Sequence, residues 1–201
     1  RGRSSVSVAA PGVDIVSLRA GEVAFDDGTL VPADDPSARY MRLSGTSMAA
    51  PHVTGVIALV KSLSPGRDWR AIKNLIIAGG DQIAGQEVLS MTGRRLNAHG
   101  ALTCSGERVF AASSPPPVFP LPAGTAVTVS VLNIHCATPA GQVRAVTSNG
   151  SRFDLRDDGI APDLAARDGN YTATFTPATP TEWVKFTSSN QTTALPHLSF
   201  G

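Results

Sequence analysis

The pattern of apolar and polar residues divides the chain into a helical first half and a strand-rich second half. Residues 47–63 are apolar almost throughout, which predicts a helix in the middle of a domain rather than on its face. A second helix is predicted from Asp68, a suitable N-cap, to the glycine pair at residues 79–80. Three further segments precede these helices, namely strands at residues 6–10 and 13–18 and a surface loop at residues 21–39.

In the second half, strands are predicted at residues 126–134, 142–147, 171–175 and 183–187. Turn residues separate these strands at intervals typical of small β-sandwiches. Before them lies Ser113-Ser114-Pro115-Pro116-Pro117, and consecutive prolines favour an extended spacer because they lack N–H donors. We therefore predict an α/β domain over residues 1–104, a proline-rich linker over residues 105–122, and an all-β sandwich domain with a C-terminal tail over residues 123–201.

Length and charge exclude several classes of function. The chain has 201 residues, of which 42% are hydrophobic and 16% are charged, as expected of one large or two small folded domains. The formal net charge of +1 gives no electrostatic case for binding nucleic acid or a membrane surface. No apolar run approaches the roughly 20 residues that a membrane-spanning helix needs.

The two cysteines, Cys104 and Cys136, lack the CxxC spacing of a zinc site. They form either one disulfide of a secreted protein or two unrelated buried thiols. A disulfide closing a loop of this length stabilises a protein by about 3–4 kcal/mol. The spacing alone leaves both possibilities open.

The run GTSMAAPHVTG, from Gly45 to Gly55, carries the strongest chemical signal. It places Ser47 at the start of the predicted helix, where unpaired N–H groups can hold the oxyanion that forms when a nucleophile attacks a carbonyl. A serine at such a position is usually only a helix cap. However, the run resembles, nearly letter for letter, the serine segment of subtilisin-like serine peptidases. The resemblance makes Ser47 the candidate nucleophile, with its own N–H group in the oxyanion hole. The supporting residues of the motif are Gly45, Thr46, Met48, Pro51 and His52, with Pro51 expected in the first helical turn.

The resemblance extends over roughly residues 5–103. Ala10-Pro11-Gly12 looks like the family's segment on a neighbouring strand, and residues 72–80 and 92–102 look like its closing helices. It implies part of a three-layer α/β domain and serine endopeptidase activity through an acyl-enzyme on Ser47. It also implies protein or peptide substrates, a secreted or cell-surface location and no cofactor for the chemistry.

The family's mechanism needs a histidine base, an aspartate that orients it and an asparagine amide in the oxyanion hole. In the family these groups precede the serine, but residues 1–46 contain no histidine, and their acidic residues lack the family's sequence contexts. His52 lies more than one helical turn beyond Ser47, so it is not expected to act as the base. We expect an upstream segment of the same protein to supply the missing groups and the 201-residue chain alone to be inactive. The alternative is a non-catalytic fragment, or one chain of a two-chain enzyme, whose β-sandwich serves as a binding or adhesion module.

A second candidate site is the aspartate-rich segment RFDLRDDGIAPDLAARDGNYTATF. Ca²⁺ prefers several oxygen ligands, and the candidates here are Asp157, Asp158, Asp163 and Asp168. The spacing does not match an EF-hand, and Asp-Gly pairs also mark tight turns. The sequence leaves two interpretations of this segment open: it binds a structural Ca²⁺, or it forms solvated turns without an ion. The segment resembles a recurring element of immunoglobulin-like or fibronectin-like accessory domains in secreted enzymes.

Overall fold

The computed structural model describes residues 6–18, 23–24, 30–31, 40–85, 89–112, 124–179, 182–189 and 198–199. The chain forms two compact units, one of residues 10–55 and one of residues 1–9 with 56–201. Most of the predicted surface loop, the proline run and most of the C-terminal tail lie outside the described residues. None of the helices in the described part is long and apolar enough to cross a bilayer.

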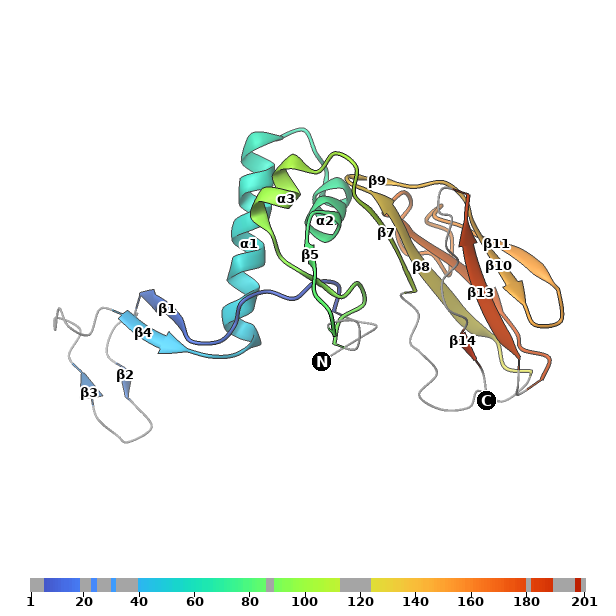
Figure 1. Ribbon diagram of the computed structural model, residues 1–201, viewed down its shortest axis with the longest axis horizontal. Coiled ribbons are helices and arrows are strands. Elements are labelled where there is room, and N and C mark those ends of the chain that lie inside the picture. The colour runs from blue at the N-terminus through green and yellow to red at the C-terminus, as the bar shows by residue number, and fades with distance from the viewer. Residues whose placement is uncertain are drawn as a thin grey trace. The chain divides into compact units, whose positions relative to one another are not determined.

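The unit of residues 10–55 contains two short antiparallel ribbons. Strand β1 (Ile15–Leu18) pairs with β4 (Tyr40–Leu43), and β2 (Val23–Ala24) pairs with β3 (Leu30–Val31) (Figure 1). Ser44 and Gly45 follow β4 directly, and helix α1 (Thr46–Leu63) begins at the next residue. The ribbon β1–β4 therefore leads straight into the N-terminus of α1.

Helix α1 confirms the predicted helix, but its apolar side chains are covered only in part by the described residues. Val56 and Val60 are buried, whereas Ile57 is 40% exposed and Leu63 is 70% exposed. The expected position of Pro51 in the first turn is wrong, because α1 begins at Thr46 and the proline therefore lies in the second turn. Proline has no N–H group at that position to bond the carbonyl of Ser47.

The second helix, α2 (Trp69–Ala78), begins and ends as predicted. The Asp68 side chain accepts a hydrogen bond from the N–H of Ala71 at 3.0 Å. The short helix α3 (Ala98–Thr103) packs against α2, and a Cβ atom on Gly79 or Gly100 would meet the other helix's backbone. Only glycine allows this close approach.

Two short strands, β5 (Asp81–Gln82) and β6 (Arg94–Arg95), pair beside these helices. The strand predicted at residues 6–10 is reduced to an isolated bridge between Ala9 and Arg95. The same segment is also held by hydrogen bonds from the N–H of Met91 to the carbonyl of Val6 and from Oγ1 of Thr92 to the carbonyl of Ser7.

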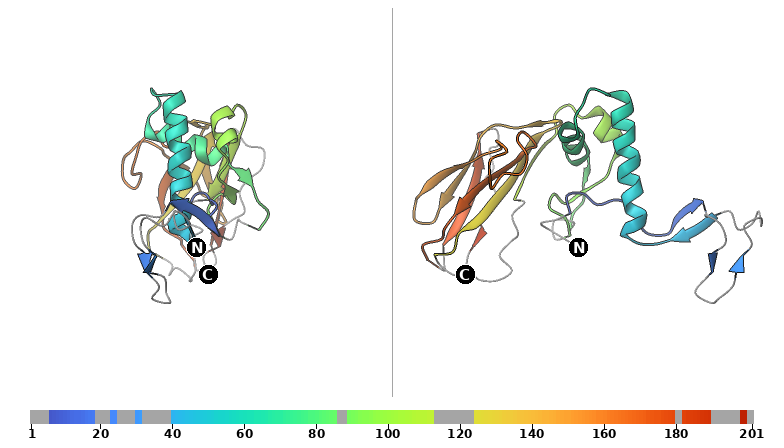
Figure 2. Two further views of the ribbon diagram at one scale, coloured as in Figure 1. Left: turned by 90° about the vertical axis from the view of Figure 1, so that its left-hand side faces the viewer. Right: turned by 180° about the vertical axis from the view of Figure 1, so that it is seen from behind.

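The rest of the second unit consists of two antiparallel sheets, seen from both sides in Figures 1 and 2. One sheet has the order β12–β8–β7, with β9 also paired to β8, and the other has the order β11–β10–β13–β14. The bounds are β7 (Arg108–Ala112), β8 (Val127–His135), β9 (Thr138–Pro139), β10 (Val143–Thr147), β11 (Arg152–Leu155), β12 (Asn170–Phe175), β13 (Trp183–Ser188) and β14 (Leu198–Ser199). The four predicted strands are confirmed as β8, β10, β12 and β13. Strand β7 lies inside the range predicted as a linker.

Strand β8 is buried on both faces, which explains its long apolar sequence. Val129 and Val131 belong to an apolar cluster shared by the two sheets, whose buried members include Val143, Val184 and Phe186. On the other face of β8, a second cluster contains Leu132, Ile134 and Val109 together with Ile77 and Ala78 of α2. Helix α2 therefore packs on the outer face of the sheet β12–β8–β7.

Candidate active site

Ser47 is the second residue of α1, and its side chain is exposed. Gly45 directly precedes the helix, and its carbonyl accepts hydrogen bonds from the N–H groups of Met48 at 3.1 Å and Ala49 at 3.3 Å. Among the described residues, the N–H of Ser47 donates no hydrogen bond. An exposed hydroxyl thus stands beside a free N–H group at the positive end of a helix, the arrangement that stabilises a developing oxyanion.

The turn before Ser47 is held closely against the segment that precedes β1. The N–H of Gly45 donates to the carbonyl of Gly12 at 2.7 Å. A Cβ atom on Gly12 would lie 2.7 Å from the Gly45 carbonyl oxygen and 3.2 Å from the Cβ of Ala49. Gly12 therefore allows the two backbones to approach, which gives a physical role to the Ala-Pro-Gly segment noted in the sequence.

His52 is bonded to its own helix. Its Nδ1 atom lies 2.9 Å from the carbonyl oxygen of Met48, and because a carbonyl only accepts, Nδ1 carries the proton. His52 is the only histidine in the sequence of residues 10–55, so this unit offers Ser47 no other imidazole. The prediction that the general base comes from an upstream segment stays a prediction.

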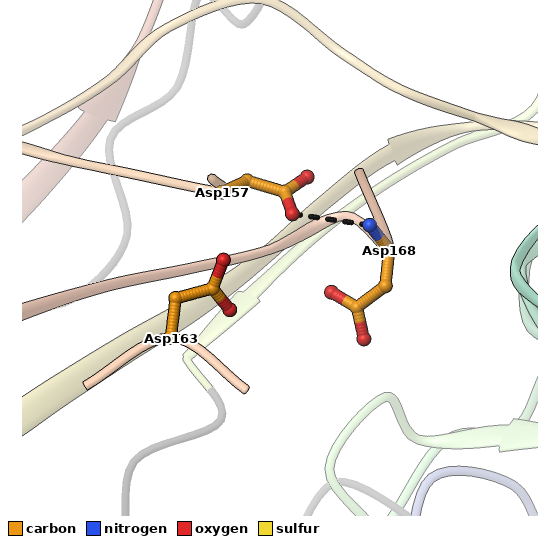
Figure 3. A group of neighbouring side chains, drawn as sticks. All are labelled: Asp157, Asp163 and Asp168. Atoms are coloured by element: carbon orange, nitrogen blue, oxygen red, sulfur yellow. Dashed lines mark hydrogen bonds between the residues drawn. The ribbon is translucent and has the colours of Figure 1, made fainter. Parts of the chain in front are cut away.

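The structure brings together three of the four aspartates proposed as calcium ligands. Figure 3 shows Asp157, Asp163 and Asp168, and one carboxylate oxygen from each lies within 4.8 Å of the others. Asp158 is outside this group, and its Oδ1 accepts a hydrogen bond from the N–H of Ile160 at 2.9 Å. Of the predicted set, Asp157, Asp163 and Asp168 share one site.

Within this cluster, the carboxylates already have partners in the chain. The two oxygens of Asp157 accept the N–H groups of Asp168 and Gly169, and the buried Asp163 accepts the N–H of Gly159 at 2.6 Å. Lys73 of α2 places its Nζ 2.7 Å from Oδ2 of Asp168. An ammonium group and backbone N–H groups therefore offset part of the negative charge, and the structural Ca²⁺ stays a prediction.

Burial and charge repulsion disfavour ionisation of Asp157. Burial raises the pKa of Asp157 above 3.8, repulsion from Asp168 and Asp163 adds to this rise, and the two N–H bonds partly offset it. Burial, together with the nearby Asp157, raises the pKa of Tyr171 to about 12. The positive charge near Asp157 therefore does not fully offset the negative charge of its two neighbouring carboxylates.

Cys104 and Cys136 form a disulfide, with their Cα atoms 5.7 Å apart. Cys104 follows α3 directly, and Cys136 follows β8. The bond joins the helices to the sheet β12–β8–β7. Both ends of this connection lie in the same compact unit.

Three residues near Ser47 and one near the aspartates were missed by sequence reasoning. The N–H of Asp14 donates to Oγ of Ser44 at 2.9 Å, and the carboxylate of Asp14 lies 2.7 Å from Nη1 of Arg42. Lys73 is separated from Asp168 by 95 positions. Only the position of Asp14, two residues after the glycine of Ala-Pro-Gly, could have drawn attention to it, and no local pattern pairs Lys73 with Asp168.

Part of the chain is similar to known serine proteases. Residues 1–94 match the Subtilase family. A subtilisin-like protease of Arabidopsis thaliana is 47% identical over 70 residues, which are 35% of this chain and 10% of the relative. A thermophilic serine proteinase of a Bacillus species is 39% identical over 98 residues, 49% of this chain and 20% of the relative. An extracellular protease of Xanthomonas campestris is 44% identical over 62 residues, 31% of this chain and 9% of the relative. The chain thus spans between 9% and 20% of the length of these relatives.

Proposed function

We propose that residues 1–104, the first 94 of which match the subtilase family, are the C-terminal portion of a subtilisin-like serine endopeptidase domain with Ser47 as its nucleophile. One observation carries the proposal. The serine of GTSMAAPHV stands exposed at the N-terminus of α1 beside its own free N–H group. A packing role does not require a hydroxyl at this position, whereas an acyl-transfer reaction does.

In this reaction, Oγ of Ser47 attacks the carbonyl carbon of the scissile peptide and loses its proton to a histidine base. The tetrahedral oxyanion accepts a hydrogen bond from the Ser47 N–H, collapses to an acyl-enzyme and expels the amine, which takes the proton. Water then hydrolyses the ester. The histidine, its aspartate and the oxyanion asparagine are expected in a segment upstream of this chain, and no cofactor is needed for the chemistry.

The exposed apolar side chains of α1 and of the ribbon β1–β4 support a missing covering segment. On α1, Ile57, Leu59 and Leu63 are each at least 40% exposed, and on the ribbon, Leu18 and Tyr40 are 73% and 64% exposed. Apolar surface of this extent usually lies against another part of a protein. The upstream segment of the same protein would cover it while supplying the base.

For the second half of the chain, we propose an immunoglobulin-like or fibronectin-like β-sandwich accessory domain. The two antiparallel sheets and their common apolar cluster support this assignment. The disulfide and the extracellular relative support a secreted or cell-surface location. The use of the sheets as a binding or adhesion module remains the alternative function.

The test compares the 201-residue chain with a longer protein that includes the expected upstream segment. A fluorophosphonate probe should label Ser47 in the longer protein, and its peptide hydrolysis should fall at least 1,000-fold, an order-of-magnitude figure, in Ser47→Ala. Ser62→Ala, which removes an exposed hydroxyl of the same helix, is the matched control and should keep full activity. The 201-residue chain should hydrolyse peptides at the background rate. Hydrolysis that survives Ser47→Ala in the longer protein would refute the proposal and favour the binding-module alternative.

A further inference from the structure

The pairing of β1 with β4 continues beyond the ribbon to the turn that carries Ser47. Ile15 is opposite Leu43 in the register, and the next pair of residues is joined by the bond from the Asp14 N–H to Oγ of Ser44. The bond from the Gly45 N–H to the carbonyl of Gly12 then follows. Two residues lie between Gly12 and Ile15, but only one lies between Leu43 and Gly45. The segment before β1 therefore contains a one-residue bulge at Val13–Asp14.

The bulge explains the backbone of Asp14. Its φ of 56° lies in the left-handed region, which aspartate adopts more readily than most residues. In this conformation its N–H reaches the Ser44 hydroxyl while its carboxylate pairs with Arg42 of β4. Bulges of this kind bend a strand and redirect the residues that follow the pairing.

We propose that the contact between Asp14 and Ser44 positions the Ser47 nucleophile, with both residues acting through the backbone and neither touching substrate. The role rests on the proposed function of Ser47. The contact fixes Ser44, the residue before Gly45, and Gly45 in turn is bonded both to Gly12 and to the N–H groups of Met48 and Ala49 in α1. The direction in which α1 leaves the ribbon, and hence the direction of the Ser47 hydroxyl, is set by this short ladder.

Hydrogen exchange of the 201-residue chain tests whether the contact orders the turn. Exchange rates are measured for peptides that span residues 10–18 and 43–50. In the wild-type chain the Asp14 and Gly45 N–H groups should be protected. Ser44→Ala should speed their exchange about 2- to 10-fold, because it removes one hydrogen bond, and Ser44→Thr should restore protection. Unprotected amides in the wild type, or unchanged exchange in Ser44→Ala, would overturn the proposal.

The chain offers a matched control for the Asp14–Arg42 pair. Arg144 of β10 and Asp154 of β11 also form an exposed pair between antiparallel neighbours, at 2.8 Å. Asp154→Asn should leave exchange in residues 10–18 and 43–50 unchanged. Asp14→Asn keeps the backbone N–H and a side chain that tolerates the left-handed region, so its effect should be smaller than that of Ser44→Ala.

The effect of the contact on catalysis is measured in the longer protein, which includes the expected upstream segment. Ser44→Ala should lower kcat about 3- to 10-fold while KM stays within about twofold, because the nucleophile is displaced and substrate contacts are not. Ser44→Thr should recover the kcat of the wild type. The midpoint of thermal unfolding should be the same in both Ser44 variants as in the wild type. An unaltered kcat, or a loss carried by KM alone, would overturn the positioning role. If the longer protein shows no Ser47-dependent hydrolysis, the proposed function has failed, and the exchange result still decides whether the contact orders the turn.

Discussion

Replacing Lys73 with methionine tests how α2 is attached to the loop before β12. The Nζ of Lys73 lies 2.7 Å from Asp168, and the two side chains are 31% and 14% exposed. Asp168 shares its surroundings with Asp157 and Asp163, whose described hydrogen-bond partners are backbone N–H groups. Methionine keeps most of the apolar stem of lysine, so the substitution mainly removes the charge.

The expected loss in the free energy of unfolding lies between two limits. Exposed ion pairs contribute about 0.2–1 kcal/mol, whereas removing one partner of a fully buried pair costs about 3–5 kcal/mol. The pair of Lys73 and Asp168 is partly buried. We therefore expect Lys73→Met to lower the free energy of unfolding by about 1–2 kcal/mol, which lowers the unfolding midpoint of a chain of this size by about 2–8 °C.

Urea unfolding of four proteins measures this effect: the wild type, Lys73→Met, Asp168→Asn and the double variant. The double-mutant cycle should give a coupling energy of about 1 kcal/mol. Arg144→Met, which breaks the exposed pair with Asp154, should cost less than about 0.5 kcal/mol. Strictly additive single substitutions, or a Lys73→Met protein as stable as the wild type, would refute the reasoning.

The same variants test the calcium prediction. If Ca²⁺ binds the three carboxylates, millimolar CaCl₂ should stabilise Lys73→Met more than the wild type, because the ion replaces the lost positive charge at Asp168. Equal midpoints with and without CaCl₂ in both proteins would contradict a structural Ca²⁺ at this cluster.

Two further predictions concern the disulfide and the pH dependence of the cluster. Replacing both Cys104 and Cys136 with alanine should lower the free energy of unfolding, measured by urea unfolding, by about 3–4 kcal/mol. A loss below about 1 kcal/mol would contradict a stabilising role of the disulfide. For Asp157, whose folded pKa is raised above 3.8, the stabilising contribution is fully present below the unfolded pKa and is lost as the pH rises through the folded value. A carboxyl-carbon NMR titration should show this raised pKa and a lower one in Asp163→Asn, and identical values would exclude repulsion from Asp163.

The sequence predicted long, strongly patterned elements well and elements defined by tertiary contacts poorly. Helix α2 was recognised from the Asp68 cap and its final glycines, and β8 from an apolar run that is now seen to be buried on both faces. Strand β7 was missed because its sequence, Arg108–Ala112, is short and lies next to the proline run. Its strand conformation depends on pairing with β8, which no local pattern reveals.

The candidate sites show the same division between local and tertiary signals. Ser47 can be proposed from the sequence because its whole motif is contiguous, and the start of α1 lies within that motif. The aspartates were grouped by sequence proximity alone, so Asp158 was included although its carboxylate bonds locally to the N–H of Ile160. Lys73, far away in the sequence, was left out. Residues joined only by the fold could not be found from spacing.

Helix α2 links the two halves of the chain more tightly than a flexible linker would. It belongs to the segment that matches the subtilase family, yet its Ile77 and Ala78 are buried against Val109, Leu132 and Ile134 of the sheets. The disulfide and the ion pair of Lys73 fasten the same interface at two other points. A module that only recruits a substrate needs no such contacts with α2 and α3, since a tether suffices. The proposed accessory domain therefore also supports the helices, and changes at the aspartate cluster should act on the stability of α2 as well as on that of the sheets.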